Sequence, residues 1–543
     1  MRGVVTLVIA MVLPLLPAGA TSATDEKPAA DEQLPTDPAL VTGRLPNGLS
    51  YIIRRHRNPE DRVNIWLHVA TGSLNETEST RGLAHYLEHL AFNGSANFPR
   101  GSVVPFFQSL GLAFGRDQNA FTSFDQTTYQ LTLPGSGRDL LEKGMLFMSD
   151  VAGRLNLATP EIDAERQIIL EEKRARSGAR QRIQDQIYAQ LAPESTVGRR
   201  LPIGAEETIK AIARPDFADY YARWYVPSNM TVIVVGDTDP AMVADVITRE
   251  FGGAPAVPRP TPRDVGVKPT AVPRAIVATD PELTRAEVSI MKVAPPRDPT
   301  TTVAGKRRDL VDVIGAWTFA RRMNAEIAAG RVSFRDADAT VRDWTGVMRT
   351  VSVEASGRPG TWRAMLADLG TALQRARLYG FTEREVEDAR AALIAQGEEA
   401  VQHETTRPAR DVLREINGAV SRQEPPMSAS QSLALLRRLL PGITAAEVSQ
   451  AFAATFDPSQ ALIVAELPSQ EAVPSEGELV ALGRAAVDVK PDKPVEVARP
   501  TTLLATLPAA GAVVETETHA ASDVASMWLD NGVRVHHRFM DQR

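Results

Sequence analysis

Alternating apolar and polar residues predict short β-strands in the first half of the chain. Residues 49–54 and 63–70 alternate β-branched or aromatic side chains with polar ones, the period of a strand with one buried face. Residues 119–122, 127–133 and 230–235 are also predicted as strands, and residues 103–110, 140–155, 159–176 and 217–225 as helices. This mixture favours an α+β fold in which helices pack on one face of a largely antiparallel sheet.

One further helix is predicted just after residue 80 from a stripe of apolar residues at helical spacing. The stripe, which would face a core, consists of Leu83, Ala84, Leu87, Leu90 and Ala91. The hydroxyl side chains that could cap its N-terminus are those of Thr77, Ser79 and Thr80. Asn93-Gly94 is a typical C-terminal stop.

Two segments of the chain are echoed later in the sequence. The helix–Pro-Ser–strand pattern of residues 217–237 recurs at 448–467, and the Asn-Gly turn of residues 45–51 recurs at 528–535. We therefore expect two homologous α/β sandwich domains, each with helices packed on a mainly antiparallel sheet, followed by a linker and the start of a third. The expected segments are a signal peptide (1–23), a disordered leader (24–38), a catalytic domain (39–256), a linker (257–273), a second, non-catalytic domain (274–468), a linker (469–526) and a truncated third repeat (527–543).

Composition narrows the class of protein and its compartment. A chain of 543 residues is too long for one core, and a formal charge of −7 gives no support to nucleic-acid binding. The one basic cluster, at residues 173–182, is explained by a solvated helix face.

Arg2, the apolar run 4–16 and small residues before position 24 predict an export signal, and no other stretch could span a bilayer. We expect a periplasmic or secreted protein with no stable membrane span after signal cleavage. Because the chain has no cysteine, metal ligands must come from His, Asp and Glu.

His85, Glu88 and His89 are the residues that indicate chemistry. Positions i, i+3 and i+4 share one face of a helix, so both imidazoles and the carboxylate project into one small volume. Two imidazoles one turn apart can bind zinc, and the intervening carboxylate is placed to handle a metal-bound water. The alternative is a core helix whose histidines find ordinary hydrogen-bond partners.

A hydrolytic zinc site needs a third protein ligand. The acidic helix at 160–176 is the expected source, and it carries Glu161, Glu165, Glu171 and Glu172. Glu165 and Glu172 lie two turns apart on one face and can both point toward the motif helix. We read Glu161 and Glu171 as surface charges.

These residues resemble the pitrilysin/insulinase family of zinc metallopeptidases, the inverzincins, which carry H-x-x-E-H with a distal glutamate. The similarity is clear over residues 45–237, is looser to 467, and is closest in character to the bacterial periplasmic zinc proteases. Besides the motif it rests on Asn47-Gly48, Gly72-Ser73, Gly94, Gly115-Arg116-Asp117, Asn119-Ala120-Phe121-Thr122, Asp163-Ala164-Glu165-Arg166, Pro202-Ile203-Gly204 and Pro227-Ser228-Asn229-Met230.

The resemblance implies a role for each of these acidic residues. One zinc ion would be bound by His85, His89 and Glu172, with Glu165 orienting the ligands and Glu88 activating water. The spacing from His89 to Glu172 is somewhat longer than is usual in the family, which leaves Glu171 as a substitute ligand.

The resemblance also implies a substrate strand, Asn119, Ala120 and Phe121, that pairs with an extended peptide and favours unfolded or short polypeptides. Ordinary core packing is the alternative for Phe121 and for nearby Phe124.

One departure from the family bears on activity, because members generally close a chamber between two halves and only the first half is present here. We expect zinc binding, with poor cleavage unless a second-half polypeptide or homologous subunit is added. The first alternative is a catalytically weak or inactive member that acts as a structural or assembly subunit. The second, a metal-storage or transport protein, would have no reason to keep Glu88.

Overall fold

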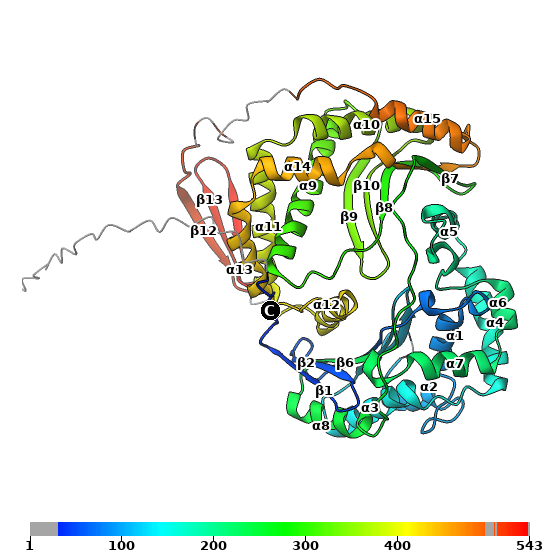
Figure 1. The fold of residues 1–543 in the computed structure, drawn as a ribbon. Coiled ribbons are helices and arrows are strands. Elements are labelled where there is room, and N and C mark those ends of the chain that lie inside the picture. Colours follow the sequence, from blue (N-terminus) through cyan, green and yellow to red (C-terminus); the bar gives the residue numbers. More distant parts are fainter. Residues whose placement is uncertain (1–30, 114, 495–503, 505, 507, 541–543) are drawn as a thin grey trace, which may run out of the picture.

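The computed structural model describes residues 31–494, 504, 506 and 508–540, apart from residue 114. The predicted signal peptide at 1–23 lies outside these residues. Figure 1 shows two α/β layers stacked one above the other, with a small third sheet beside the upper one.

The first domain contains a six-stranded sheet in the order β1-β2-β6-β3-β5-β4. Its only parallel pair is β2 with β6, so the sheet is mainly antiparallel as predicted. The predicted strands are confirmed, and that at 127–133 coincides with β5. The bounds are β1 Leu40–Arg44, β2 Ser50–Arg55, β3 Val63–Val69, β4 Gln118–Thr122, β5 Thr127–Leu133 and β6 Met230–Gly236.

Helices of the first domain cover one face of this sheet. The side chains Ile65 and Leu67 of β3 lie in one core with Leu83 and Leu87 of α1, because the apolar stripe of α1 faces the sheet as predicted. The bounds are α1 Leu83–Leu90, α2 Val103–Ser109, α3 Arg138–Gly153, α4 Thr159–Ala175, α5 Ala179–Leu191, α6 Glu206–Ala211, α7 Arg214–Trp224 and α8 Pro240–Phe251.

The second domain repeats this topology. Its sheet has the order β7-β11-β8-β10-β9, and its only parallel pair, β7 with β11, corresponds to β2 with β6. The short turns before β6 and β11, Pro227–Asn229 and Pro458–Gln460, are both 3₁₀-helical, which explains the echo in the sequence. The strand bounds are β7 Arg274–Asp280, β8 Ala286–Ala294, β9 Asp336–Trp344, β10 Met348–Gly357 and β11 Leu462–Pro468.

The helices of the second domain extend into the segment expected to be a linker. Since α8 follows β6 in the first domain, α15 is its counterpart after β11; it packs against α10 and β7. The linker prediction for 469–526 is therefore wrong for the residues of α15, and also for the strand Val513–His519 and the start of the strand Val524–Leu529. The bounds are α9 Val303–Ala328, α10 Trp362–Tyr379, α11 Glu383–His403, α12 Ala409–Arg422, α13 Ala429–Leu439, α14 Ala445–Thr455 and α15 Glu476–Val487.

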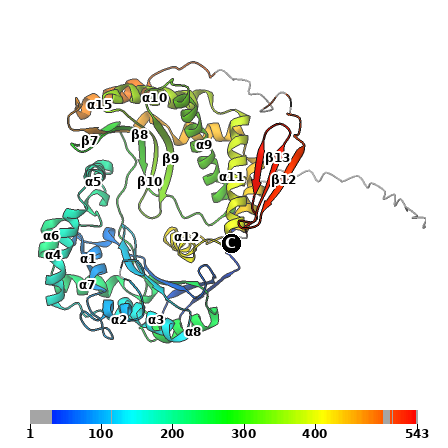
Figure 2. The same cartoon turned by 180° about the vertical axis from the view of Figure 1, so that it is seen from behind.

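Each domain covers the second face of the other domain's sheet with one helix. Leu413 and Ile416 of α12 pack with Trp66 of β3 in the lower layer (Figure 2). Leu191 of α5 packs with Ile276 of β7 in the upper layer. The sequence predicted one covered face for each sheet, whereas both faces are covered because the domains exchange these helices.

Residues 31–38 of the predicted leader are ordered. Leu34 is 8% exposed within the core of the second domain, and its amide donates to Thr301 O at 2.8 Å. Asp37 Oδ2 lies 3.3 Å from Arg54 NH1 on β2. The prediction of disorder is therefore wrong for 31–38, because one buried leucine and this ion pair tie a polar segment to both domains.

The last described strands form a separate three-stranded antiparallel sheet: β12 Val513–His519, β13 Val524–Leu529 and β14 Arg534–His537. The turn between β13 and β14 repeats the turn between β1 and β2. Gly532 N donates to Leu529 O at 3.0 Å, as Gly48 N donates to Leu45 O at 2.9 Å, and both glycines have positive φ. The Asn-Gly echo therefore reflects the same hairpin turn.

Candidate metal centre

The helix α1 is capped by a buried carboxylate rather than by a hydroxyl. Gly82 occupies the N-cap position, and Glu76 accepts hydrogen bonds from Gly82 N at 2.9 Å and Ala84 N at 2.8 Å. The prediction that Thr77, Ser79 or Thr80 caps α1 is wrong. These hydroxyls belong to the preceding 3₁₀ turn, in which Thr77 N donates to Thr80 Oγ1.

The N-terminus of α1 is also fixed by backbone packing. Gly82 has φ +94°, and a Cβ on Gly204 would lie 2.3 Å from Gly82 Cα. Only glycine permits such close approach of two backbones at positive φ. The backbone of the Pro202-Ile203-Gly204 segment thus packs directly against the N-terminus of α1.

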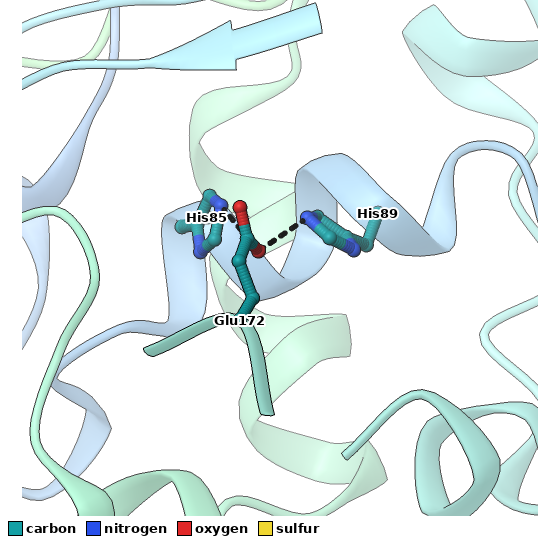
Figure 3. Close-up of side chains that lie close together, drawn as sticks. All are labelled: His85, His89 and Glu172. Carbon is teal, nitrogen blue, oxygen red and sulfur yellow. Dashed lines mark ion pairs between the residues drawn. The ribbon is translucent and has the colours of Figure 1, made fainter. Parts of the chain in front are cut away.

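His85, His89 and Glu172 converge in the structure, as Figure 3 shows. One ligand atom from each lies within 4.8 Å of the others. Glu172 Oε2 is 3.5 Å from His85 Nε2 and 3.3 Å from His89 Nε2. The histidines come from consecutive turns of α1 and the glutamate from the last turn of α4, so two helices build the cluster.

Glu165 and Asn93 hold His89 from behind. Glu165 Oε1 lies 2.8 Å from His89 Nδ1, which leaves His89 Nε2 directed at Glu172. Asn93 Nδ2 donates to the other oxygen of Glu165 at 2.6 Å. This arrangement fixes the orientation of the imidazole, as a carboxylate behind a metal-bound histidine commonly does.

Glu88 lies on the same helix and is almost fully buried, with 6% exposure. Its Oε2 accepts a hydrogen bond of 2.5 Å from Thr122 Oγ1 at the end of β4. Burial raises the pKa of Glu88 to about 7, against the lowering effect of the Thr122 hydrogen bond. A carboxyl group with a pKa near neutrality suits proton transfer in both directions.

The two imidazoles have opposite electrostatic surroundings. Burial, followed by the charge of His89, lowers the pKa of His85 to about 4. Burial alone would lower the pKa of His89, but the carboxylates of Glu165 and Glu172 outweigh it and raise that pKa to about 9. The imidazole of His89, 3.3 Å from Oε2, lowers the pKa of Glu172. The cluster therefore presents one neutral imidazole and a carboxylate held in its charged form.

A divalent cation fits this cluster. The buried Glu172 Oε2 has no well-directed hydrogen bond, although two imidazole nitrogens lie within 3.5 Å. A buried carboxylate oxygen without a hydrogen bond is costly unless a cation compensates it. Two imidazoles and one carboxylate are a donor set typical of catalytic zinc, in which water takes the fourth position.

The other acidic residues of α4 point elsewhere. The side chain of Glu171 is 58% exposed and pairs with Arg174 at 2.8 Å. Glu161 pairs with Arg100 at 2.8 Å. Neither belongs to the metal cluster, and Glu171 does not replace Glu172. Glu171 is a surface charge as predicted, whereas the side chain of Glu161 is only 14% exposed.

The predicted substrate strand forms β4, the edge strand of the first sheet. Within the part of the chain that the structure describes, β4 pairs only with β5, and Asn119 and Ala120 lie on it. The ring of Phe121 packs edge-on against Trp66, with centroids 6.4 Å apart. Phe121 therefore has a packing role beside any contact with substrate, and Phe124 contacts Tyr188.

Sequence reasoning missed three residues that shape this centre: Glu76, Asn93 and Thr122. Asn93 follows His89 by four residues, just beyond the end of α1, and Thr122 directly follows the predicted substrate strand. These two positions in the sequence could have indicated that Asn93 and Thr122 lie near the centre. Glu76 has none, because its partners depend on how the chain turns back onto α1.

The fold and the site together define a two-domain α+β protein whose first repeat carries an H-x-x-E-H metal centre. The model of the insulinase domain (peptidase family M16) matches residues 51–202, and that of the peptidase M16 inactive domain matches residues 211–393. Together they cover well over half of the chain, which therefore belongs to the insulinase family of peptidases. The inactive-domain match falls largely on the second repeat, which lacks the motif.

Similar proteins are described as zinc proteases. The chain is 30% identical over 428 residues to the probable zinc protease PqqL of Escherichia coli, covering 77% of this chain and 45% of that protein. It is 28% identical over 410 residues to a PQQL-like zinc protease of Arabidopsis thaliana, covering 75% of this chain and 40% of that protein. The chain thus spans less than half the length of these relatives.

Solved structures agree with the fold. The first half of the periplasmic protease PqqL from Escherichia coli superimposes with a TM-score of 0.80 at 27% identity, covering 86% of this chain and all of that one. The whole PqqL protease gives 0.81 at 26% identity, covering 94% of this chain and 57% of that one. Among the described residues, no helix is long and apolar enough to cross a membrane.

Proposed function

We propose that this chain is the catalytic half of a zinc-dependent metalloendopeptidase that hydrolyses unfolded or short polypeptides. The observation that carries the proposal is the convergence of His85, His89 and Glu172, with the buried Glu88 on the same helix. These residues would hold one zinc ion. When bound, the ion would supply Lewis-acid catalysis and activate a water molecule for attack.

Glu88 would act first as general base and then as general acid. Its carboxylate accepts the proton of the attacking water and afterwards donates it to the leaving amine. Thr122 Oγ1 holds one oxygen of Glu88 at 2.5 Å, which leaves the other oxygen for the proton. Glu165 keeps His89 in the orientation that directs Nε2 inward.

The edge strand β4 supports an extended peptide as the substrate. Peptide pairing along β4 would use its unpaired backbone groups, and Asn119, Ala120 and Phe121 would lie beside the substrate. Because Thr122 ends this strand and touches Glu88, a peptide paired along β4 is led toward the general base. Folded domains rarely offer such a free segment, which favours unfolded or short polypeptides.

A second polypeptide segment is part of this proposal, and so is the compartment. The chain covers 45% of the length of the Escherichia coli relative, whose solved counterpart is described as periplasmic. We propose that full activity needs a C-terminal half or a homologous subunit. The predicted export signal and this relative support a periplasmic location.

The test compares Glu88→Gln and Glu172→Gln, with Glu171→Gln as the matched control on the exposed side of α4. Zinc content and cleavage of a quenched fluorescent peptide are measured, with and without a second-half chain. Glu88→Gln should retain zinc and lose turnover, and Glu172→Gln should bind zinc at least about tenfold more weakly. The control should match the wild type in both measurements.

Other outcomes would contradict specific parts of the proposal. An unchanged rate in Glu88→Gln would remove the assigned mechanism. Zinc binding without cleavage, even with a second half present, would favour a structural or assembly subunit. Full cleavage by the purified chain as a monomer would remove the need for a partner.

A further inference from the structure

A cavity of about 450 Å³ adjoins the metal centre and plays no part in binding the ion. It lies between residues 122–124, the end of α4, the helix α5 and residues 201–203. Two of its lining residues touch the centre itself, because Thr122 donates to Glu88 and Arg176 pairs with Glu172. A substrate side chain that occupies this cavity would therefore belong to a residue next to the scissile bond.

One wall of the cavity is aromatic. The ring of Phe124 packs edge-on against Tyr188, with centroids 5.6 Å apart. Trp344, at the end of β9 in the second domain, backs both rings at 5.8 and 5.9 Å. This wall suits the methylene groups of a side chain, and both domains hold it in place.

Two cationic residues, Lys173 and Arg176, also line the cavity. Lys173 Nζ donates to Gly204 O at 2.8 Å and forms no ion pair among the described residues, although its charge also acts on Glu206. The one acidic residue in the lining, Asp185, accepts a hydrogen bond from Gln181 at 2.7 Å. Arg176 pairs with Glu172 Oε1, and its side chain is 62% exposed, so its guanidinium lies at the rim of the cavity.

We infer that this cavity is a substrate subsite that selects an acidic side chain, glutamate best, next to the scissile bond. The inference rests on the proposed peptidase function. The methylene groups of the glutamate would lie on Phe124 and Tyr188, and its carboxylate would reach Lys173 and Arg176. Glutamate has one more methylene group than aspartate to place on these two rings.

The experiment measures binding first, so that it does not depend on turnover. Fluorescein-labelled peptides that differ only at the two positions flanking the expected cleavage site carry Glu, Gln, Lys or Phe there. Their affinities for the zinc-loaded Glu88→Gln chain are measured by fluorescence anisotropy. We expect the Glu peptide to bind about tenfold more tightly than the Gln peptide, the size expected for a charge-assisted contact.

Lys173→Glu, added to Glu88→Gln, is the test variant. Arg174→Glu is its matched control, since Arg174 is exposed on the same helix and pairs with Glu171. Lys173→Glu should abolish the preference for Glu or reverse it toward Lys, and Arg174→Glu should leave it unchanged. Equal affinity for the Glu and Gln peptides, tighter binding of Phe, or a preference that survives Lys173→Glu would overturn the subsite.

Cleavage of the same peptides by the chain with native Glu88 separates this inference from the proposed function. Cleavage without any preference for charge would remove the subsite and leave the peptidase. A preference in binding that depends on Lys173, with no cleavage even when a second-half chain is present, would remove the peptidase and leave the subsite.

Discussion

Glu76 provides a prediction that can be worked out from the structure in detail. Its carboxylate is 1% exposed and holds the first turn of α1 through Gly82 N and Ala84 N. Burial raises its pKa from 4.5 to about 8, against the lowering effect of these two backbone donors. The perturbation is Glu76→Gln, which keeps the size of the side chain and removes its titration.

The sign of the pH dependence follows from proton binding. Between pH 4.5 and 8 the folded chain keeps a proton on Glu76 that the unfolded chain has lost. The contribution of Glu76 to stability is therefore fully present below pH 4.5 and falls by about 1.4 kcal/mol per pH unit as the pH rises toward 8. The free energy of unfolding of Glu76→Gln should accordingly gain about 2 to 3 kcal/mol on that of the wild type between pH 5.5 and 7.5.

Urea unfolding at several pH values measures this difference. Trp224 is 2% exposed in the first domain and reports its unfolding by fluorescence. Glu78→Gln is the matched control, because Glu78 is exposed and the hydrogen bond from Arg200 lowers its pKa. The difference in free energy of unfolding between Glu78→Gln and the wild type should be constant above pH 5.5. If the difference between Glu76→Gln and the wild type is equally constant, burial does not govern the protonation of Glu76, and the reasoning is wrong.

Three further predictions concern the centre and the domain contact. Thr122→Val should lower kcat about tenfold without loss of zinc, because Glu88 loses its hydrogen bond; an unchanged kcat would remove the positioning role of Thr122. Leu413→Ala should destabilise the chain by about 2 to 5 kcal/mol in urea unfolding, and a loss below about 1 kcal/mol would mean that α12 is not needed to cover the first sheet. Zinc at a hundredfold excess over its Kd should stabilise the chain by about 2.7 kcal/mol in thermal unfolding, and Glu172→Gln should lose this stabilisation at the same zinc concentration. Equal stabilisation of both proteins would contradict the assignment of Glu172 as a ligand.

Local sequence patterns predicted the parts of the fold that depend on local periodicity. The strand β5 and the helix α1 were placed from alternation and from an apolar stripe, and both patterns need only neighbouring residues. The positions of His85 and His89 follow from α1, because i and i+4 share a face. The convergence of Glu172 with them joins residues more than eighty positions apart: helix geometry makes Glu165 and Glu172 the candidates, and only the family resemblance assigns the ligand role to Glu172.

The missed elements depend on contacts between distant segments or on a signal that was overlooked. The helix α15 begins at a Ser-x-x-Glu capping box, in which Ser475 N donates to Glu478 Oε2 at 2.7 Å. This capping pattern can be read from the sequence, although the Ala-, Pro- and Glu-rich composition of the segment favours a linker. No local pattern predicts that the leader is ordered, because Leu34 is buried only once the second domain has formed.

The exchange of helices between the domains gives the second repeat a part in the metal centre, although that repeat lacks the motif. Glu172 lies on α4, and the chain passes from α4 to α5 within a few residues. The helix α5 is held on the second domain by the apolar contacts of Leu191 and by two hydrogen bonds from Arg182 to Asp280, at 2.6 and 2.8 Å. The two histidines, by contrast, are fixed entirely within the first domain. The helix α4 itself packs in the core of the first domain through Ile162, Ile169 and Leu170, so the second repeat acts on Glu172 only through the short connection from α4 to α5.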